Sequence, residues 1–404
     1  MKVLSLFSGC GGMDIGFEGG FECLRASVDP QANPSWIAHD GEGYFVKLAK
    51  TGFETVFAND IRPDAKAAWE SYMGSSHPEG TYRLASVVDL VKEEREGGGV
   101  FPTDVDVVTG GFPCQDFSVA GKRLGFESAK SHSGSVRDPM EPSVESRGQL
   151  YMWMRDVISI CKPKVFVAEN VKGLTNLGDA KQIIEHDFAE ADGGGYTIVP
   201  AHVINARDYG VPQSRERVIF FGFRRDALSA EALEALISEQ VPAEYDPYPP
   251  KTHGSGLAPY ATCSDAFAGL LEPWESNDPA QAAYSRCRLL ARGQGQNEVK
   301  LGSVSPTIRS EHHGNIEYRR LSAEHGGEHA DELAAGLPER RLSVRECARL
   351  QTFPDSYPFI IPSRDGNIAV SASKAYQLIG NAVPPVLAYA VAQNLASKWE
   401  RYFG

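Results

Sequence analysis

Short apolar runs alternate with longer amphipathic segments through the first half of the chain. The runs have the length and the Val, Ile and Phe content of buried strands, and the segments between them have helical spacing. The pattern predicts strands at 3–7, 55–58, 106–109, 165–168, 197–199 and 218–221, and helices near 63–73, 150–160 and 179–191. This alternation predicts an α/β fold with a doubly wound, mostly parallel sheet, whose ligands lie at the carboxyl ends of the strands.

The rhythm of strands and helices stops after residue 225. Residues 226–337 are rich in Pro, Gly and polar side chains, and helical patterning returns at 341–353 and again at 371–399. A chain of 404 residues is also long for a single core. The sequence therefore predicts one domain from 1–225 together with 338–404, and a second, irregular domain at 226–337.

Composition narrows the class of protein. No apolar run approaches the length of a membrane span, and the opening residues lack a secretory signal, so we expect a cytoplasmic protein with no membrane partner. The seven cysteines are scattered without CxxC or Cys/His spacing, which predicts neither a disulfide framework nor a zinc site. The net charge of −13 argues against a nucleic-acid partner, but residues 284–320 carry seven Lys/Arg against three acids. Charge alone therefore does not decide the partner.

A glycine-rich turn follows the first predicted strand, in "FSGCGGMDIGF". Its glycines allow a tight turn and a close approach of the backbone to a ligand. Phe7 stands where it could cover a purine, and Asp60, in "FANDI" at the end of the next strand, is of the type that accepts hydrogen bonds from ribose hydroxyls. Dehydrogenases, methyltransferases and plain tight turns share such loops, and Asp60 could equally be a surface carboxylate.

One cysteine stands on a rigid turn, in "TGGFPCQDFSVAGKR". Pro113 restricts the backbone just before Cys114, directly after the strand predicted at 106–109. A thiol at the carboxyl end of a strand is a candidate nucleophile, although a buried structural cysteine is the commoner case.

Two further segments carry candidate chemistry. Glu169 and Asn170, in "AENV", end the strand predicted at 165–168, where they could face the same cleft as Cys114 or cap a helix. In "PQSRERVIFFG", the side chains of Gln213, Arg215 and Arg217 alternate and so point the same way on an extended segment. That alternation could also describe a solvated strand face.

Taken in order, these segments resemble a known family. "FSGCGG", "GGFPCQDFS", "ENV", "QSRERV" and "QLIGNAVPP" resemble the blocks of the DNA cytosine-5 methyltransferases of prokaryotic restriction-modification type. The resemblance covers 1–225 and 338–404. It implies a Rossmann-like S-adenosylmethionine-dependent domain with a smaller target-recognition domain at 226–337, and transfer of a methyl group to C5 of cytosine in a specific double-stranded DNA sequence. An RNA cytosine methyltransferase and a catalytically silent DNA-binding homologue are the alternatives.

The resemblance also implies catalytic roles. Cys114 would add to C6 of the base, which is covalent catalysis by a sulfur nucleophile. Glu169 would contact N3 and the exocyclic amine of the cytosine, and Arg217 would contact O2. Arg215 would orient Glu169, and Asn170 would hold the turn.

The implied cofactor is S-adenosylmethionine, with no metal. Phe7 would stack near the adenine, Ile61 would pack on its other side, and Asp89 would meet its amino group. Asp29, in "GFECLRASVDP", is a rival to Asp60 for the ribose hydroxyls. The full set of expected cofactor residues is Phe7, Gly9, Gly11, Gly12, Asp60, Ile61, Asp89, Pro113, Asn381 and Val383.

The target base would be rotated out of the duplex into the pocket. The loop after Cys114 would cover the DNA, and the domain at 226–337, where Thr307 and Ile308 resemble the Thr plus aliphatic pair of such domains, would read the sequence. Expected DNA contacts are Ser118, Lys122, Arg123, Gln213, Thr307 and Arg309. We expect a monomer that associates with the nucleoid and acts separately from any cognate restriction endonuclease. Insertions near 20–54 and 128–144 have no predicted role.

Overall fold

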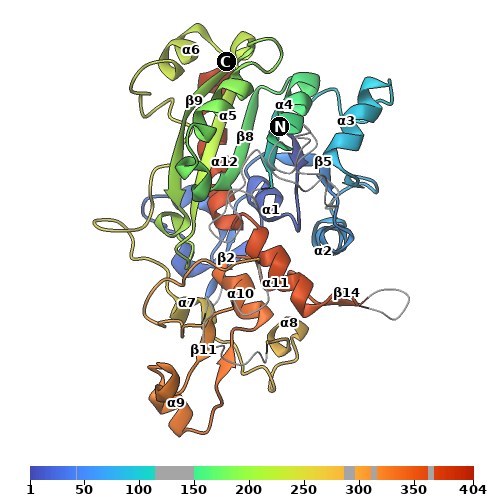
Figure 1. The fold of residues 1–404 in the computed structure, drawn as a ribbon. Helices are drawn as coiled ribbons and strands as arrows, with labels where there is room; N and C mark the ends of the chain where they lie inside the picture. Colours follow the sequence, from blue (N-terminus) through green and yellow to red (C-terminus); the bar gives the residue numbers. More distant parts are fainter. Residues whose placement is uncertain (42, 114–149, 286–295, 311–315, 363–367) are drawn as a thin grey trace.

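The central element is a seven-stranded sheet in the order β6-β5-β1-β7-β8-β10-β9 (Figure 1). The computed structural model describes residues 1–41, 43–113, 150–285, 296–310, 316–362 and 368–404. All pairings from β6 to β8 are parallel, and β10 runs antiparallel to both β8 and β9. The strands are β1 (Lys2–Leu6), β5 (Glu54–Asp60), β6 (Tyr82–Leu84), β7 (Val107–Gly111), β8 (Val165–Val171), β9 (Tyr196–Asn205) and β10 (Glu216–Arg224). The predicted mostly parallel sheet is confirmed.

Helices cover both faces of this sheet. Successive strand residues enter opposite apolar layers: Val107 and Val165 lie in one, and Val108 and Phe166 in the other. Burial on both faces explains why these strands read as continuous apolar runs. The first layer includes α1 (Gly12–Glu18), α2 (Pro63–Met73), α6 (Ala230–Leu236) and α12 (Pro385–Phe403), and the second includes α3 (Val87–Arg95), α4 (Leu150–Cys161) and α5 (Ala180–Ala189).

A smaller lobe lies below the sheet in Figure 1 and holds α7 (Cys263–Phe267), α8 (Pro279–Ala282), α9 (Ala330–Ala334), α10 (Val344–Leu350) and α11 (Ala372–Asn381). Its short strands are β11 (Tyr318–Arg320), β12 (Arg340–Arg341), β13 (Ile361–Pro362) and β14 (Ile368–Val370). Contacts between helices cross the domain limits expected at 226 and 338, which stay a prediction. Helix α10 packs on α7 and α8, whereas α6 packs on α12 and β9 of the sheet. The pattern of apolar residues along the chain does not show which elements pack together.

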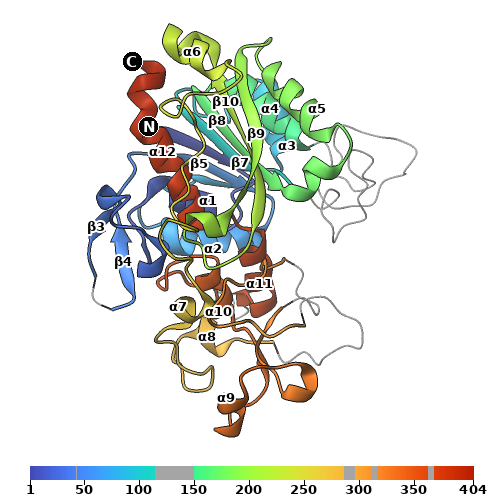
Figure 2. The same ribbon diagram turned by 90° about the vertical axis from the view of Figure 1, so that its left-hand side faces the viewer.

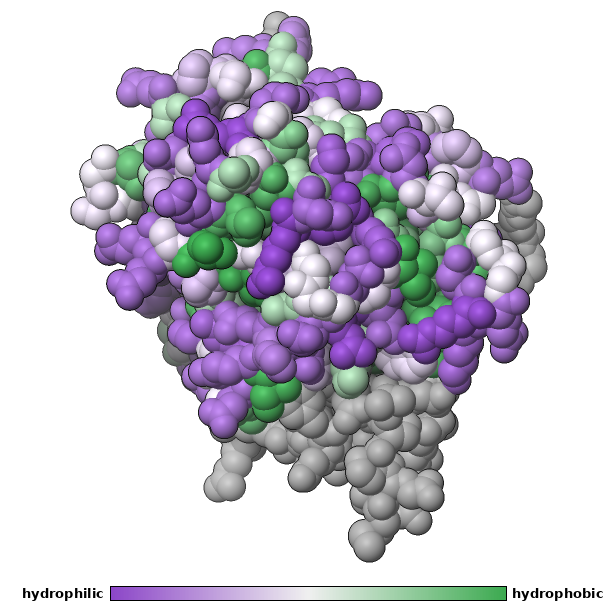
Figure 3. Space-filling view, turned by 90° about the horizontal axis from the view of Figure 1, so that it is seen from above, coloured by the Kyte–Doolittle hydropathy of each residue, from purple (hydrophilic) through white to green (hydrophobic). Residues whose placement is uncertain are grey.

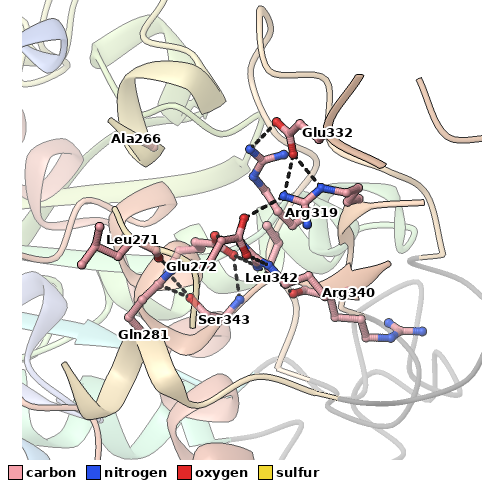
Figure 4. A network of polar contacts seen from close by, with 12 residues as sticks. Ala266, Leu271, Glu272, Gln281, Arg319, Glu332, Arg340, Leu342 and Ser343 are labelled. Carbon is pink, nitrogen blue, oxygen red and sulfur yellow. Dashed lines mark hydrogen bonds and ion pairs between the residues drawn. The ribbon is translucent and has the colours of Figure 1, made fainter. Parts of the chain in front are cut away.

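Within the small lobe, a buried network of charges joins the chain at 272–332 to the chain at 340–346 (Figure 4). Arg320 and Arg340 both bind Glu272 with N–O distances of 2.7 Å, and Arg340 also binds Glu346 at 2.7 Å. Arg320 is wholly buried and also pairs with Glu332. Arg320 therefore contributes nothing to a phosphate-binding surface, although it belongs to the basic stretch at 284–320.

The insertion near 20–54 forms a separate small sheet at the left of Figure 2, in the order β2-β4-β3. Its strands are β2 (Glu22–Leu24), β3 (Ile37–His39) and β4 (Phe45–Leu48). Trp36 packs edge-on against Tyr389 of α12, and the Arg349 guanidinium of α10 lies 5.0 Å from the ring of Phe45. The insertion thus contacts both the sheet lobe and the small lobe.

The face seen from above is mostly hydrophilic, with hydrophobic side chains in separated groups (Figure 3). Among the described residues, no helix is long and apolar enough to cross a bilayer.

Candidate active site

The glycine-rich loop lies at the carboxyl end of β1, in the middle of the sheet. Phe7, Gly9 and Gly11 have φ values of 53°, 54° and 81°. A Cβ on Gly11 would lie 2.7 Å from the Trp69 side chain. Both the left-handed backbone and this close packing require glycine at position 11.

Asp60 ends β5 beside this loop. Its two carboxylate oxygens accept hydrogen bonds from the backbone N–H groups of Gly9, at 3.1 Å, and Arg62, at 3.0 Å. Burial raises the pKa of Asp60, while these donors oppose the shift. The rival Asp29 accepts from Gln31 and Ala32 in a turn of the insertion. Only Asp60 of the two makes a hydrogen bond to the glycine loop.

Exposed aliphatic side chains flank Asp60. Ile61 is 44% exposed, and Leu84, which pairs with Asp60 across β5 and β6, is also 44% exposed. The sequence analysis misses Leu84, because a strand as short as β6 has no clear pattern of its own. Asp89 is exposed in the first turn of α3, and the hydroxyl of Ser86 caps that helix by accepting from the Val88 N–H at 3.2 Å.

The C-terminal segment returns to the glycine loop. A Cβ on Gly12 would lie 2.3 Å from the carbonyl oxygen of Val383 and 3.1 Å from the Ala382 side chain. Asn381 is exposed at the end of α11, one residue before Ala382. The turn at 381–383 therefore packs on the start of α1.

These groups fit the adenosine part of S-adenosylmethionine. The loop offers backbone without side chains, Asp60 offers a carboxylate for ribose hydroxyls, and Ile61 and Leu84 offer apolar surface for a base.

Asp14 is a buried acid behind the loop that sequence reasoning misses. Its carboxylate accepts from the Ser5 hydroxyl at 2.5 Å and from the Trp69 indole N–H at 2.8 Å. Burial raises the pKa of Asp14 to about 6. The only sequence signal is an acid in the first helical turn after the glycines.

The second cluster lies at the carboxyl ends of β7 and β8. Glu169 pairs with Gly111 of β7 on one side and with Ile219 of β10 on the other. Its Oε1 forms an ion pair with the Arg217 Nε at 2.7 Å, and both side chains are nearly buried. A Cβ on Gly111 would lie 3.0 Å from the Glu169 Oε2, so the segment that leads to Cys114 starts beside this carboxylate.

Asn170 holds the same segment. Its Nδ2 donates to the carbonyl of Phe112 at 3.2 Å, and the side chain is buried. Pro113 follows at the last described position before the gap. Cys114, Ser118, Lys122 and Arg123 lie outside the described residues.

Glu169 forms its ion pair with Arg217, and the expected role of Arg215 in orienting Glu169 stays a prediction. The Arg215 guanidinium donates to the carbonyls of Ile308, Gly380 and Ala382 at 3.0, 2.8 and 2.9 Å. Alternation along an extended segment predicts one direction for these side chains. It cannot tell which neighbour each one reaches.

Gln213 is wholly buried, which contradicts its predicted role as a DNA contact. Its amide binds Gln351 and the backbone of Leu350 and Ile308. The other two described DNA candidates differ: Arg309 is exposed, and Thr307 is half-buried and donates to the Ser214 carbonyl at 2.6 Å. No group of His, Cys, Asp and Glu within the described part of the chain could hold a metal ion.

Comparison with known proteins decides the family. The model of the C-5 cytosine-specific DNA methylases matches residues 42–397. The chain belongs to this family. The methyltransferase is 35% identical to the type II methyltransferase M.BspRI of Lysinibacillus sphaericus, over 98% of this chain and 81% of that protein. It is 34% identical to M.BsuRI of Bacillus subtilis, over 98% of this chain and 79% of that protein. The predicted DNA cytosine-5 methyltransferase activity is thereby confirmed, with S-adenosylmethionine as the cofactor that this family implies.

Solved structures share the fold of this methyltransferase. A DNA modification methyltransferase encoded within an E. coli prophage superposes with a TM-score of 0.58 at 19% identity, over 99% of both chains. The Dnmt2 methyltransferase of S. pombe superposes with a TM-score of 0.57 at 18% identity, over 98% of both chains. These likenesses confirm the predicted methyltransferase fold.

Proposed function

We propose that this methyltransferase modifies one cytosine within a short double-stranded DNA sequence, through a covalent bond between Cys114 and C6 of a base rotated out of the duplex. It would serve as the modification enzyme of a type II restriction-modification system, as the names of its relatives suggest. We expect a cytoplasmic monomer that acts separately from any cognate endonuclease.

The observation that carries this proposal is the position of the Glu169–Arg217 pair. It lies next to Gly111, three residues before Cys114, at the ends of adjacent strands. The proposed nucleophile, Cys114, is therefore only three residues along the chain from Gly111, which lies beside the Glu169 carboxylate that can share a proton with the base. That is the arrangement expected when covalent addition and proton transfer occur on one small ring.

Covalent addition is needed because C5 of cytosine is a poor nucleophile. The Cys114 sulfur would bond to C6 while N3 takes a proton from Glu169, which turns the ring into an enamine whose C5 can attack. When bound, S-adenosylmethionine supplies an electrophilic methyl group on a sulfonium. Loss of the C5 proton to water and breaking of the S–C6 bond then restore the ring, and N3 returns its proton to Glu169.

Arg217 has two tasks in this scheme. It holds the Glu169 carboxylate through Nε, and its remaining N–H groups provide donors for O2 of the base.

Only a few per cent of a free thiol, with a pKa near 8.5, is thiolate at neutral pH, so Cys114 depends on its surroundings for activation.

The cofactor would lie over Gly9, Gly11 and Gly12, with its ribose on Asp60 and its adenine near Phe7 and Ile61. The expected set of cofactor residues is completed by Asp89, Asn381, Val383 and Pro113.

Rotation of the base out of the duplex costs a few kcal/mol, which contacts in the pocket would offset. Thr307 and Arg309 would contact DNA from the small lobe, and Ser118, Lys122 and Arg123 from the loop after Cys114.

The test combines product analysis with trapping of the adduct. The protein is incubated with labelled S-adenosylmethionine and either unmethylated genomic DNA or total RNA, and bisulfite sequencing locates the product. A duplex with 5-fluorocytosine at the site found should then form a denaturant-resistant protein–DNA adduct, because fluorine replaces the proton that must leave. Cys114→Ala should lose both the product and the adduct. Cys161→Ala, at a buried thiol in α4, should keep both.

Two results would change the assignment. Methylation by Cys114→Ala would remove that residue as the nucleophile. Label that appears in RNA and not in DNA would favour an RNA substrate.

A further inference from the structure

The expected recognition segment is joined to the motif that carries Arg217. The Ser305 N–H donates to the Pro212 carbonyl at 3.0 Å, and the Ser214 N–H donates to the Ser305 carbonyl at 2.8 Å. Thr307 adds a bond from its hydroxyl to the Ser214 carbonyl at 2.6 Å. The backbone from 305 to 307 is thus held in register against 212–214.

Two buried side chains hold the next residue, Ile308, by both of its backbone polar groups. Its N–H donates to the Gln213 Oε1 at 2.9 Å, and its carbonyl accepts from the Arg215 Nη1 at 3.0 Å. Gln213 and Arg215 are 0% and 1% exposed, so water cannot easily replace either partner. A displacement of Ile308 would leave buried polar groups without partners, at a large cost in a low-dielectric interior.

The same two side chains are also linked to the end of α11 and to Ala382, which follows it, Arg215 directly and Gln213 through Gln351. Arg215 donates to the carbonyls of Gly380 and Ala382. Gln213 donates to the Gln351 Oε1 at 2.5 Å, and the Gln351 amide donates to the Ile379 carbonyl at 3.0 Å. Two separate hydrogen-bonded paths therefore link Ile308 to the end of α11.

Direct packing adds a third link. A Cβ on Gly380 would lie 2.3 Å from the carbonyl carbon of Arg309 and 2.4 Å from the backbone nitrogen of Ser310. The backbone at 309–310 therefore contacts α11 with no intervening side chain. Val383, three residues after Gly380, contacts Gly12 of the glycine-rich loop.

We propose that Gln213 and Arg215 are positioning residues that couple DNA binding at 307–309 to S-adenosylmethionine binding beneath the turn at 381–383. The inference rests on the proposed function for the location of both ligands. Ordering of either segment by its ligand would order the other through the shared buried bonds. Because coupling between binding sites is reciprocal, each ligand should tighten the binding of the other by the same factor.

The experiment measures this factor as a ratio of dissociation constants. The Kd of S-adenosylhomocysteine is measured by calorimetry on the full-length protein, alone and with a saturating duplex that carries the site found by bisulfite sequencing. The variants are Arg215→Lys, which cannot reach three carbonyls with a single ammonium, and Gln213→Met, which keeps the size of the side chain. Arg349→Lys is the matched control, because Arg349 also donates to buried carbonyls, of Ala266 and Ala268, away from the turn.

For the parent protein we expect a coupling factor of about 5- to 150-fold, the usual range for linked sites. Arg215→Lys and Gln213→Met each break one of the links, so each should lower this factor by at least about twofold, the value of one hydrogen bond, while Arg349→Lys keeps the parent value. Thermal melting identifies any variant that fails to fold, in which case the other variant decides.

Three outcomes would overturn the coupling. They are a parent factor of one, a parent-like factor in a folded Arg215→Lys or Gln213→Met, and an equal loss of coupling in Arg349→Lys. A parent protein that binds neither ligand would instead refute the proposed function, and the coupling with it.

Discussion

Gly12 offers a sharp test of whether the C-terminal turn closes the cofactor site. An alanine Cβ at this position would lie 2.3 Å from the Val383 carbonyl oxygen, whereas real Cβ contacts essentially never fall below 3.0 Å. The turn must therefore move by at least 0.7 Å, the difference between these two distances. Gly12 begins α1 without a positive φ, and alanine is the better helix former by about 1 kcal/mol. Any loss must accordingly come from the contact.

The magnitude follows from the cost of overpacking. Forcing extra carbon into a packed site costs about 1–3 kcal/mol. If cofactor binding requires the turn in place, this cost falls on the bound state. Since 1.4 kcal/mol corresponds to a factor of ten, Gly12→Ala should weaken S-adenosylhomocysteine binding by about 5- to 160-fold.

Calorimetric Kd values and melting temperatures for Gly12→Ala and Gly302→Ala provide the assay. Gly302 is the control, because no heavy atom lies within 4 Å of its Cβ position. An unchanged Kd in a Gly12→Ala protein with a lowered melting temperature would refute the reasoning. It would show that the turn supports the fold but takes no part in the cofactor site.

Three further predictions concern single acids. Glu169→Gln should slow single-turnover methyl transfer by about 10²- to 10⁴-fold, the range for loss of a positioned proton donor, while S-adenosylhomocysteine binding persists; an unchanged rate would exclude proton transfer by Glu169. Asp60→Asn should raise the Kd of S-adenosylhomocysteine by about 10- to 150-fold through weaker charged hydrogen bonds, whereas Asp29→Asn should change it by less than about twofold; the reverse order would assign the ribose to Asp29. Asp14 has a folded-state pKa of about 6, above the unfolded value of about 3.9, so its contribution to stability is present at low pH and is lost as pH rises from about 4 to about 6. Denaturant unfolding should show that this loss, about 3 kcal/mol, is missing in Asp14→Asn, and equal pH slopes in the two proteins would contradict the assignment.

The sequence by itself determined six of the seven strands of the central sheet, the order of the motifs and the family. A buried parallel strand must be apolar on both faces, and a tight loop must use glycine, so both leave a local record in the chain. The helix predicted at 63–73 coincides with α2 (Pro63–Met73) for the same reason, since Pro63 starts it and Gly74 follows its end. Asp60 and Glu169 were identifiable as candidates because Asp60 ends β5 and Glu169 lies near the carboxyl end of β8.

Only the tertiary structure decided which groups meet. Alternation predicts that Gln213, Arg215 and Arg217 share one side of an extended segment. Their partners come from distant parts of the chain, such as Gly380, which is 165 positions from Arg215. Arg217 consequently pairs with Glu169, and Arg215 donates to the carbonyls of Ile308 and Ala382. The tertiary structure also decided the extent of the small lobe. Helix α10 belongs to it because of long-range packing, which no local sequence pattern encodes.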